Sequence, residues 1–167
     1  MSFIWHYFYT VGDREMNRRI AVRGIALHDG KLLCVRLRPY QGKIRTEGGD
    51  FWCLPGGGLE DSEAILDGIE REMLEETGIK PVIGKLLYVH QFAFDGNEYL
   101  EFFFHITNSE DYLYIDLSNT THGEKELAEI AFIDPTAVRV LPTFLSTDPL
   151  QAIATSDDPA RIVSLLK

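Results

Sequence analysis

Apolar and polar residues are patterned along the chain as short strands before and after one helical segment. Residues 20–28 and 31–37 are strand-like runs separated by Asp29-Gly30, a dipeptide typical of tight hairpin turns. Residues 81–94 and 99–107 are rich in β-branched and aromatic residues and are separated by a second Asp-Gly pair. The pattern therefore predicts two β-hairpins.

Between these hairpins the apolar residues recur at helical spacing. Residues 63–77 are predicted to form a helix of about four turns, with Asp61 or Ser62 as its N-cap and Gly78 directly after its end. At about 100° per residue, one apolar stripe is expected to face the core. The stripe consists of Ile65, Ile69 and Met73.

Toward the end of this predicted helix, the inward stripe becomes acidic. Glu72 and Glu76 share one azimuth and Glu75 lies beside them, where like charges and the helix dipole both disfavour anions. Arg71 can bridge to Asp67 and Glu75, but one guanidinium does not neutralise the cluster. A divalent cation would, although a solvated acidic helix end explains the carboxylates equally well when they are taken alone. The glycine-rich residues 54–58 favour the cation, because their backbone can approach a metal or a phosphate closely.

Composition limits the class of protein and its partners. A chain of 167 residues with 45% hydrophobic and 25% charged residues is expected to form a single domain over residues 1–167. It has no apolar run near the roughly 20 residues that span a bilayer, and its start does not resemble a secretory signal, so no membrane and a cytoplasmic location are expected. The net charge of −10 makes long nucleic acids poor partners, whereas a small phosphorylated substrate remains compatible. Cys34 and Cys53 are expected to be free thiols.

The segment from Gly57 to Ile79 resembles the Nudix box, G-x5-E-x7-R-E-U-x-E-E-x-G-U with U an aliphatic residue. Every defined position matches, from Gly57 and Glu63 to the run of residues 71–79. Ser62 stands where many members have Gly, at a position that helps to start the helix and is not a ligand. The preceding residues 52–57 also resemble the lead-in that is usual in the family.

This resemblance implies an α/β fold, namely the Nudix-type α/β/α sandwich with a mixed sheet, in which residues 57–79 form loop, helix and loop. It also implies hydrolysis of a diphosphate linkage in a nucleoside diphosphate derivative, such as a (d)NTP or an ADP-ribose-like compound, with Mg²⁺ or Mn²⁺ as cofactor. Arg71 would orient the carboxylates, while Glu63 and Gly78 would be structural. The implied metal ligands are Glu72, Glu75, Glu76 and the carbonyl of Gly57.

Candidate residues outside the box come from the two segments that flank it. In this family the loop after Arg36 and Arg38, residues 39–50, borders the substrate, so the candidate substrate-binding cations are Arg36, Arg38, Lys43 and Arg45. Lys43 and Arg45 are expected either to touch phosphate or to be solvated charges. Family members often supply another carboxylate from the region after the polar segment 108–125. The candidates for the general base are therefore Glu72, Glu76, Glu126 and Glu129, and the alternative for Glu126 and Glu129 is that they are exposed charges.

The chain ends are predicted from weaker patterns. The aromatic residues 1–17 are expected to be an extension or an edge strand that packs over the core or on a subunit partner, which leaves a homodimer open. A short strand is predicted over residues 130–133, a short helix over 134–141 and a helical tail over 142–167.

Two alternatives to catalysis remain: a nucleotide-sensing module that binds without turnover, and a partner-binding protein on the same fold. Loss of box carboxylates would be the sequence sign of either, and none is lost here. The sequence does not determine which nucleoside diphosphate derivative is the substrate.

Overall fold

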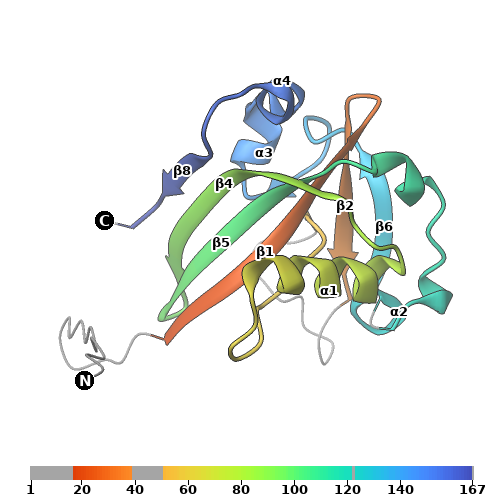
Figure 1. Cartoon of the computed structure of the whole chain (residues 1–167), viewed down its shortest axis with the longest axis horizontal. Helices are drawn as coiled ribbons and strands as arrows, with labels where there is room; N and C mark the ends of the chain where they lie inside the picture. Colours follow the sequence, from red (N-terminus) through yellow and green to blue (C-terminus); the bar gives the residue numbers. More distant parts are fainter. Residues whose placement is uncertain (1–16, 39–50, 122, 167) are drawn as a thin grey trace.

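The computed structural model describes residues 17–38, 51–121 and 123–166 (Figure 1). Lys43, Arg45 and all of the predicted N-terminal strand except Asn17 therefore lie outside the described residues. Within the described ranges, none of the helices has the length and apolarity needed to cross a membrane.

In the part of the chain that the structure describes, eight strands form one mixed sheet in the order β7-β3-β2-β1-β5-β4-β8, with β6 paired to β2. The β1–β5, β3–β7 and β4–β8 pairs are parallel, and the other pairs are antiparallel. The strands are β1 Asn17–His28, β2 Lys31–Leu37, β3 Trp52–Cys53, β4 Ile83–Phe94, β5 Asn97–Ile106, β6 Leu127–Ile133, β7 Val140–Leu141 and β8 Arg161–Ser164. The helices are α1 Ile65–Thr77, α2 Gly123–Glu126, α3 Phe144–Thr147 and α4 Leu150–Thr155, with the 3-10 helices η1 Ser109–Leu113 and η2 Leu117–Asn119.

Both predicted hairpins are confirmed. Asp29 and Gly30 have φ of 47° and 74°, and Asp95 and Gly96 have φ of 48° and 75°. Two successive left-handed residues make the tight turn whose twist matches that of the flanking strands. Asp-Gly supplies this turn at low strain, which is why the sequence signal was reliable at both places.

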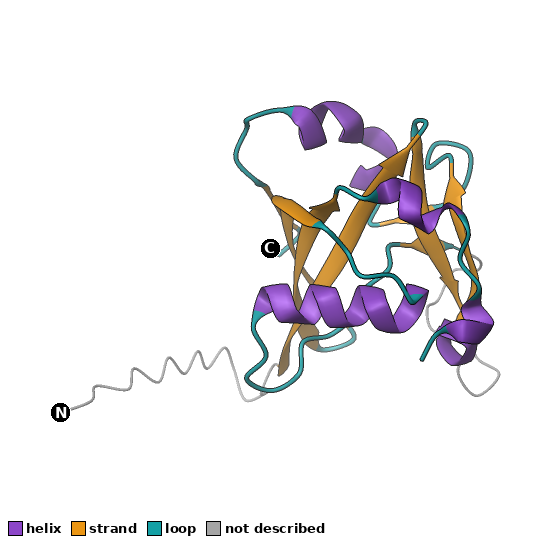
Figure 2. Cartoon of the chain, turned by 45° about the vertical axis from the view of Figure 1, so that its right-hand side comes forward, coloured by secondary structure: helices purple, strands orange, loops and turns teal. Residues whose placement is uncertain are grey.

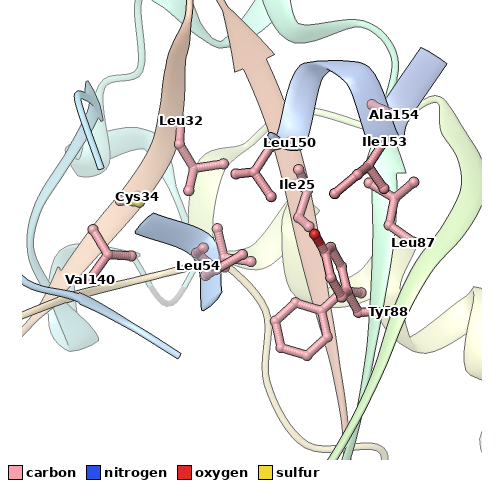
Figure 3. Packing of buried hydrophobic residues seen from close by; sticks show 12 residues of the cluster. Ile25, Leu32, Cys34, Leu54, Leu87, Tyr88, Val140, Leu150, Ile153 and Ala154 are labelled. Carbon is pink, nitrogen blue, oxygen red and sulfur yellow. The ribbon is translucent and has the colours of Figure 1, made fainter. Parts of the chain in front are cut away.

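The strands bury residues on both faces, which confirms the predicted sandwich (Figure 2). On β1, Val22 and Ala26 belong to the core cluster that contains Ile69 and Met73 of α1. Ile25, on the opposite face of β1, belongs to the second cluster. Figure 3 shows this second cluster, in which side chains of α4 meet those of β1 and β4.

The strand β1 pairs with β2 at Leu27 and His28, next to the turn. Further toward its start, β1 pairs with the glycine-rich segment instead. The Val22 N–H donates to the Gly57 carbonyl at 2.9 Å, and the Leu59 N–H donates to the Ile20 carbonyl at 3.0 Å. The loop is thereby fixed to the edge of β1 by backbone hydrogen bonds, and this places the candidate site.

Two predicted elements differ from the structure in residues 134–167. The helix predicted over 134–141 is wrong: Asp134 Oδ1 accepts the Thr136 N–H at 2.8 Å, which forms a local turn, and β7 follows. The predicted helical tail contains α3 and α4 but ends in the strand β8, which pairs with β4. Tyr88 on β4 and Arg161 on β8 both donate to Asp148 Oδ2, at 2.9 and 3.1 Å, so that tertiary contacts hold this segment against the sheet.

The predicted strand over 130–133 is longer in the structure, since β6 begins at Leu127. The segment 108–125, predicted to be irregular, contains η1, η2 and the start of α2. Both cysteines are free; Cys34 is buried and Cys53 is half-buried. Burial raises the pKa of the Cys53 thiol to about 11 and that of the Cys34 thiol further.

Candidate functional site

The glycine-rich loop depends most on Gly56. Its φ of +123° lies in a region that other residues rarely adopt, and a Cβ would stand 2.2 Å from the Val22 carbonyl oxygen. In this conformation the Gly56 N–H donates to Glu76 Oε2 at 2.8 Å. The loop and the carboxylate-bearing end of α1 are therefore joined directly.

The helix α1 begins later than predicted. Ser62 has φ of 65° and lies in a turn before the helix, and Ala64 precedes the first turn without a side-chain cap. Neither Asp61 nor Ser62 is therefore the N-cap. The end of the helix agrees with the prediction, because Gly78 has φ of 73° and its N–H donates to the Leu74 carbonyl at 2.8 Å.

The inward face of α1 is confirmed for two of its three predicted apolar residues. Ile69 and Met73 are fully buried, whereas Ile65 is 36% exposed because it stands in the first turn, beyond the edge of the core. On the same side, Glu76 is 5% exposed. The helix thus carries a carboxylate into the protein interior.

Arg71, on α1, is hydrogen-bonded to two residues at the start of the box, Gly58 and Glu63. Its Nε and Nη2 donate to the two carboxylate oxygens of Glu63 at 2.7 and 2.9 Å, and Nη2 also donates to the Gly58 carbonyl at 3.0 Å. Glu63 Oε2 in turn accepts the Glu60 N–H at 2.9 Å. The hydrogen bond from Arg71 is the main reason why the pKa of Glu63 falls to about 2.

The same guanidinium also contacts two of the predicted metal ligands. Arg71 Nη1 lies 2.9 Å from Glu72 Oε1 and 3.1 Å from Glu75 Oε2. The expected bridge to Asp67 is replaced by the bidentate pair with Glu63, which brings the guanidinium under the glycine loop.

Glu72 and Glu76 differ from ordinary surface carboxylates. Burial raises the pKa of Glu76 to about 8, against the hydrogen bond from Gly56 and the charge of Arg23. Burial also raises the pKa of Glu72, against its hydrogen bond with Arg71. Because burial disfavours the ionised form of both carboxyl groups, a nearby cation would stabilise that form.

The donor set fits a hard divalent cation. A Cβ on Gly57 would lie 2.6 Å from Glu72 Oε2, so the missing side chain leaves room for this carboxylate beside the loop. No group of three or more His, Cys, Asp and Glu side chains is gathered for a metal within the described ranges. Two carboxylates and a carbonyl are still sufficient for Mg²⁺, which keeps several water ligands.

The two acidic candidates outside the box have different surroundings. Glu129 Oε2 accepts a hydrogen bond from Arg36 Nη2 at 2.7 Å across the β2–β6 pair, and the Arg36 guanidinium lies 5.5 Å from the centre of the Trp52 ring. Glu126 is close enough to Glu76 for its charge to raise the pKa of that group. The structure therefore brings Glu126, rather than Glu129, toward the box.

Arg38 lies at the end of β2 near this second carboxylate. Its backbone N–H donates to the Glu126 carbonyl at 2.8 Å, and its side chain is exposed. Of the two predicted substrate-binding cations, Arg36 pairs with Glu129, and the side chain of Arg38 is exposed at the end of β2.

Sequence reasoning missed a buried polar group on the other side of the loop. Arg23 donates from Nη1 to the Gly56 carbonyl and from Nε to Glu101 Oε1 at 3.2 Å. Glu101 Oε2 lies 3.3 Å from His90 Nδ1. The available signal was charge inside otherwise apolar strands, Arg23 in β1 and Glu101 in β5.

A hollow of about 550 Å³ lies apart from these residues, between the η1–η2 region and β6. None of the predicted site residues that the structure describes lines it. Its lining is Tyr112, Leu113, Tyr114, Ile115, Asp116, Ile130, Ala131 and Phe132.

Known proteins resemble this chain in both sequence and fold. An ADP-ribose pyrophosphatase of Methanocaldococcus jannaschii is 34% identical over 73 residues, which are 42% of this chain and 38% of that protein. A MutT-like protein of Streptomyces ambofaciens is 37% identical over 73 residues, 43% of this chain and 42% of that protein. The matched residues therefore span less than half the length of these curated relatives.

The crystal structure of a MutT protein from Methanosarcina mazei Go1 superposes with a TM-score of 0.61 at 24% identity, covering 80% of this chain and 91% of that one. This likeness agrees with the mixed sheet and flanking helices described above. The family model of the NUDIX domain matches residues 17–154, which is most of the chain. The chain belongs to the Nudix family.

Proposed function

We propose that this protein hydrolyses a diphosphate linkage in a small nucleoside diphosphate derivative, such as a (d)NTP or an ADP-ribose-like compound. The observation that carries the proposal is the position of two carboxylates. Glu72 is half-buried and Glu76 is buried, and both lie against a loop whose conformation depends on glycine. The M. jannaschii relative named ADP-ribose pyrophosphatase supports the same substrate class.

Mg²⁺ or Mn²⁺ would be held by Glu72, Glu76 and the carbonyl of Gly57. That carbonyl accepts one hydrogen bond, from Val22, and keeps a second lone pair. Glu75, the remaining predicted ligand, accepts a hydrogen bond from Arg71 at 3.1 Å through Oε2, as Glu72 does at 2.9 Å through Oε1. When bound, such an ion neutralises phosphate charge and makes a water molecule more acidic.

The residues of the chain have separate tasks in this reaction. Arg71, held by Glu63 and the Gly58 carbonyl, orients Glu72 from one side. Gly56 orients Glu76 from the other. With these two carboxylates engaged by the ion, Glu126, whose charge acts on Glu76, is our candidate to accept the proton of the attacking water. The exposed Arg38 is suited to contact substrate phosphate.

The proposal is tested by incubating the purified chain with ADP-ribose, (d)NTPs, dinucleoside polyphosphates and nucleotide sugars. Each compound is supplied with Mg²⁺, with Mn²⁺ or with EDTA, and the released mononucleotide, phosphate or pyrophosphate is measured. We expect turnover of at least one class and its loss in EDTA. Binding of nucleotides without turnover of any class would instead indicate a sensing module and contradict the proposal.

A matched pair of variants separates the site from the helix that carries it. Glu76→Gln should lower kcat by about a thousandfold or more, because it removes a charge that the bound ion requires. Glu70→Gln is the control: it lies on the same helix but pairs with Lys80 at 2.6 Å on the surface. The control should retain parental kcat within about twofold.

A further inference from the structure

The backbone of Gly56 is held on both sides of its Cα atom. Its N–H donates to Glu76 Oε2 at 2.8 Å, and its carbonyl accepts a hydrogen bond from Arg23 Nη1. Arg23 lies on β1, whereas Glu76 lies on α1. Arg23 therefore holds the carbonyl of the same residue whose N–H orients Glu76.

Arg23 is itself fixed by a buried carboxylate. Its Nε donates to Glu101 Oε1 at 3.2 Å, and the side chain of Glu101 is only 8% exposed. The second oxygen of Glu101 lies 3.3 Å from His90 Nδ1. Since an ionised carboxylate only accepts, the ring donates from Nδ1. Both oxygens of Glu101 are thus occupied, which fixes the plane of its carboxylate.

His90 is held in one orientation by aromatic neighbours. Its ring stacks on Phe92 with centroids 4.7 Å apart and meets Phe103 and Phe144 at 6.3 and 5.4 Å. Its Nε2 atom is buried without a hydrogen-bond partner among the residues that the structure describes. An unpaired buried nitrogen costs stability that a phenylalanine at this place would not. We therefore infer that the functional nitrogen of the His90 ring is Nδ1, which contacts Glu101.

We propose that His90, Glu101 and Arg23 form a positioning chain that sets the Gly56 peptide and, through it, the Glu76 carboxylate. None of the three needs to touch the substrate. The effect on hydrolysis rests on the function proposed above, whereas the effect on the loop is a property of the metal-free protein and is measured without turnover.

The first test follows the Gly56 amide by nitrogen–proton NMR and hydrogen exchange in EDTA. Glu101→Gln keeps the shape of the side chain but weakens its bonds to Arg23, so the Gly56 signal should shift and its exchange should quicken by about tenfold or more. The matched control is Glu98→Gln. Glu98 is a buried carboxylate on the same strand, but it pairs with Arg18 at 2.9 Å instead.

Substitutions of His90 show which ring atom matters. His90→Asn retains a donor near the position of Nδ1 and should keep the Gly56 signal near that of the parent. His90→Phe retains the ring without the donor and should resemble Glu101→Gln. If Glu101→Gln does not fold, Arg23→Lys serves in its place, since one ammonium cannot hold both Gly56 and Glu101 in the same geometry.

The kinetic readout distinguishes positioning from general loss of structure. Glu101→Gln and His90→Phe should lower kcat about 10- to 100-fold and leave KM within about twofold, while His90→Asn restores most of kcat. A Gly56 amide that does not change in Glu101→Gln, or that changes equally in Glu98→Gln, would overturn the proposal. Absence of any turnover by the parent would refute the proposed function. The Gly56 exchange rates would still show whether His90, Glu101 and Arg23 position Gly56.

Discussion

At the residue scale, carboxylates of one short sequence motif behave in opposite ways. Glu63 shares two hydrogen bonds with Arg71, and its pKa falls to about 2. Glu76 is buried, and its pKa rises to about 8 despite the bond from Gly56. The motif spacing alone does not reveal this difference, since it depends on which group the guanidinium reaches and which one the sheet covers.

The raised pKa of Glu76 predicts how the stability of the metal-free protein changes with pH. Below about pH 4.5 the group is protonated in both the folded and the unfolded state; between 4.5 and about 8 only the folded state keeps the proton. The free energy of unfolding therefore falls as the pH rises through this window. Glu76→Gln removes the effect, so its Tm advantage over the parent in EDTA should grow from pH 5 to pH 8.

Thermal unfolding at several pH values checks this expectation. The control is Glu110→Gln, an exposed carboxylate of η1, whose Tm difference from the parent should stay constant. A Tm difference for Glu76→Gln that is equally large at pH 5 and pH 8 would contradict the assignment of a buried, proton-retaining carboxylate.

The two general-base candidates outside the box, Glu126 and Glu129, should differ in how strongly their substitution affects kcat. Glu126→Gln is expected to lower kcat at least about tenfold and to alter the acid limb of the pH–rate profile, because Glu126 lies near Glu76. Glu129→Gln should change kcat less than about threefold, since Glu129 is engaged by Arg36. Steady-state kinetics of both variants measure this, and a larger effect for Glu129→Gln would reverse the ranking.

At the scale of elements, the glycine triplet shows that neighbouring glycines have unequal roles. Gly56 combines φ of +123° with a backbone contact that forbids a Cβ. At Gly58, a Cβ would find its nearest neighbour at 3.9 Å, the Ile20 carbonyl oxygen. The sequence alone does not distinguish Gly56 from Gly58, because their difference arises from how the loop pairs with β1.

Alanine at each of the two positions tests this difference. Gly56→Ala should reduce the free energy of unfolding by about 2 kcal/mol or more and sharply reduce kcat, because the loop must move away from β1 and Glu76. Gly58→Ala should stay within about 0.5 kcal/mol of the parent. Urea titration of both variants gives the comparison, and equal losses would show that the φ and contact at Gly56 are not limiting.

At the scale of the whole molecule, most of the sheet and the core of the site follow from local signals. The Asp-Gly turns predicted both hairpins, and Gly78 predicted the end of α1. The box spacing predicted which carboxylates gather beside the loop. Elements that depend on distant partners could not be predicted in this way. The strand β8 exists through its pairing with β4, and the polar chain from Arg23 to His90 joins residues that are far apart in sequence.

The backbone pairing of the glycine loop with β1 has a consequence for redesign. Main-chain hydrogen bonds hold this loop at Ile20, Val22 and Gly24, so its attachment to β1 does not require particular side chains in the segment that follows β5. The segment 107–121 contributes no strand to the sheet and contains the 3-10 helices η1 and η2. We therefore expect that other sequences can be grafted into this segment to change substrate preference while Glu72, Glu76 and Glu126 stay in position.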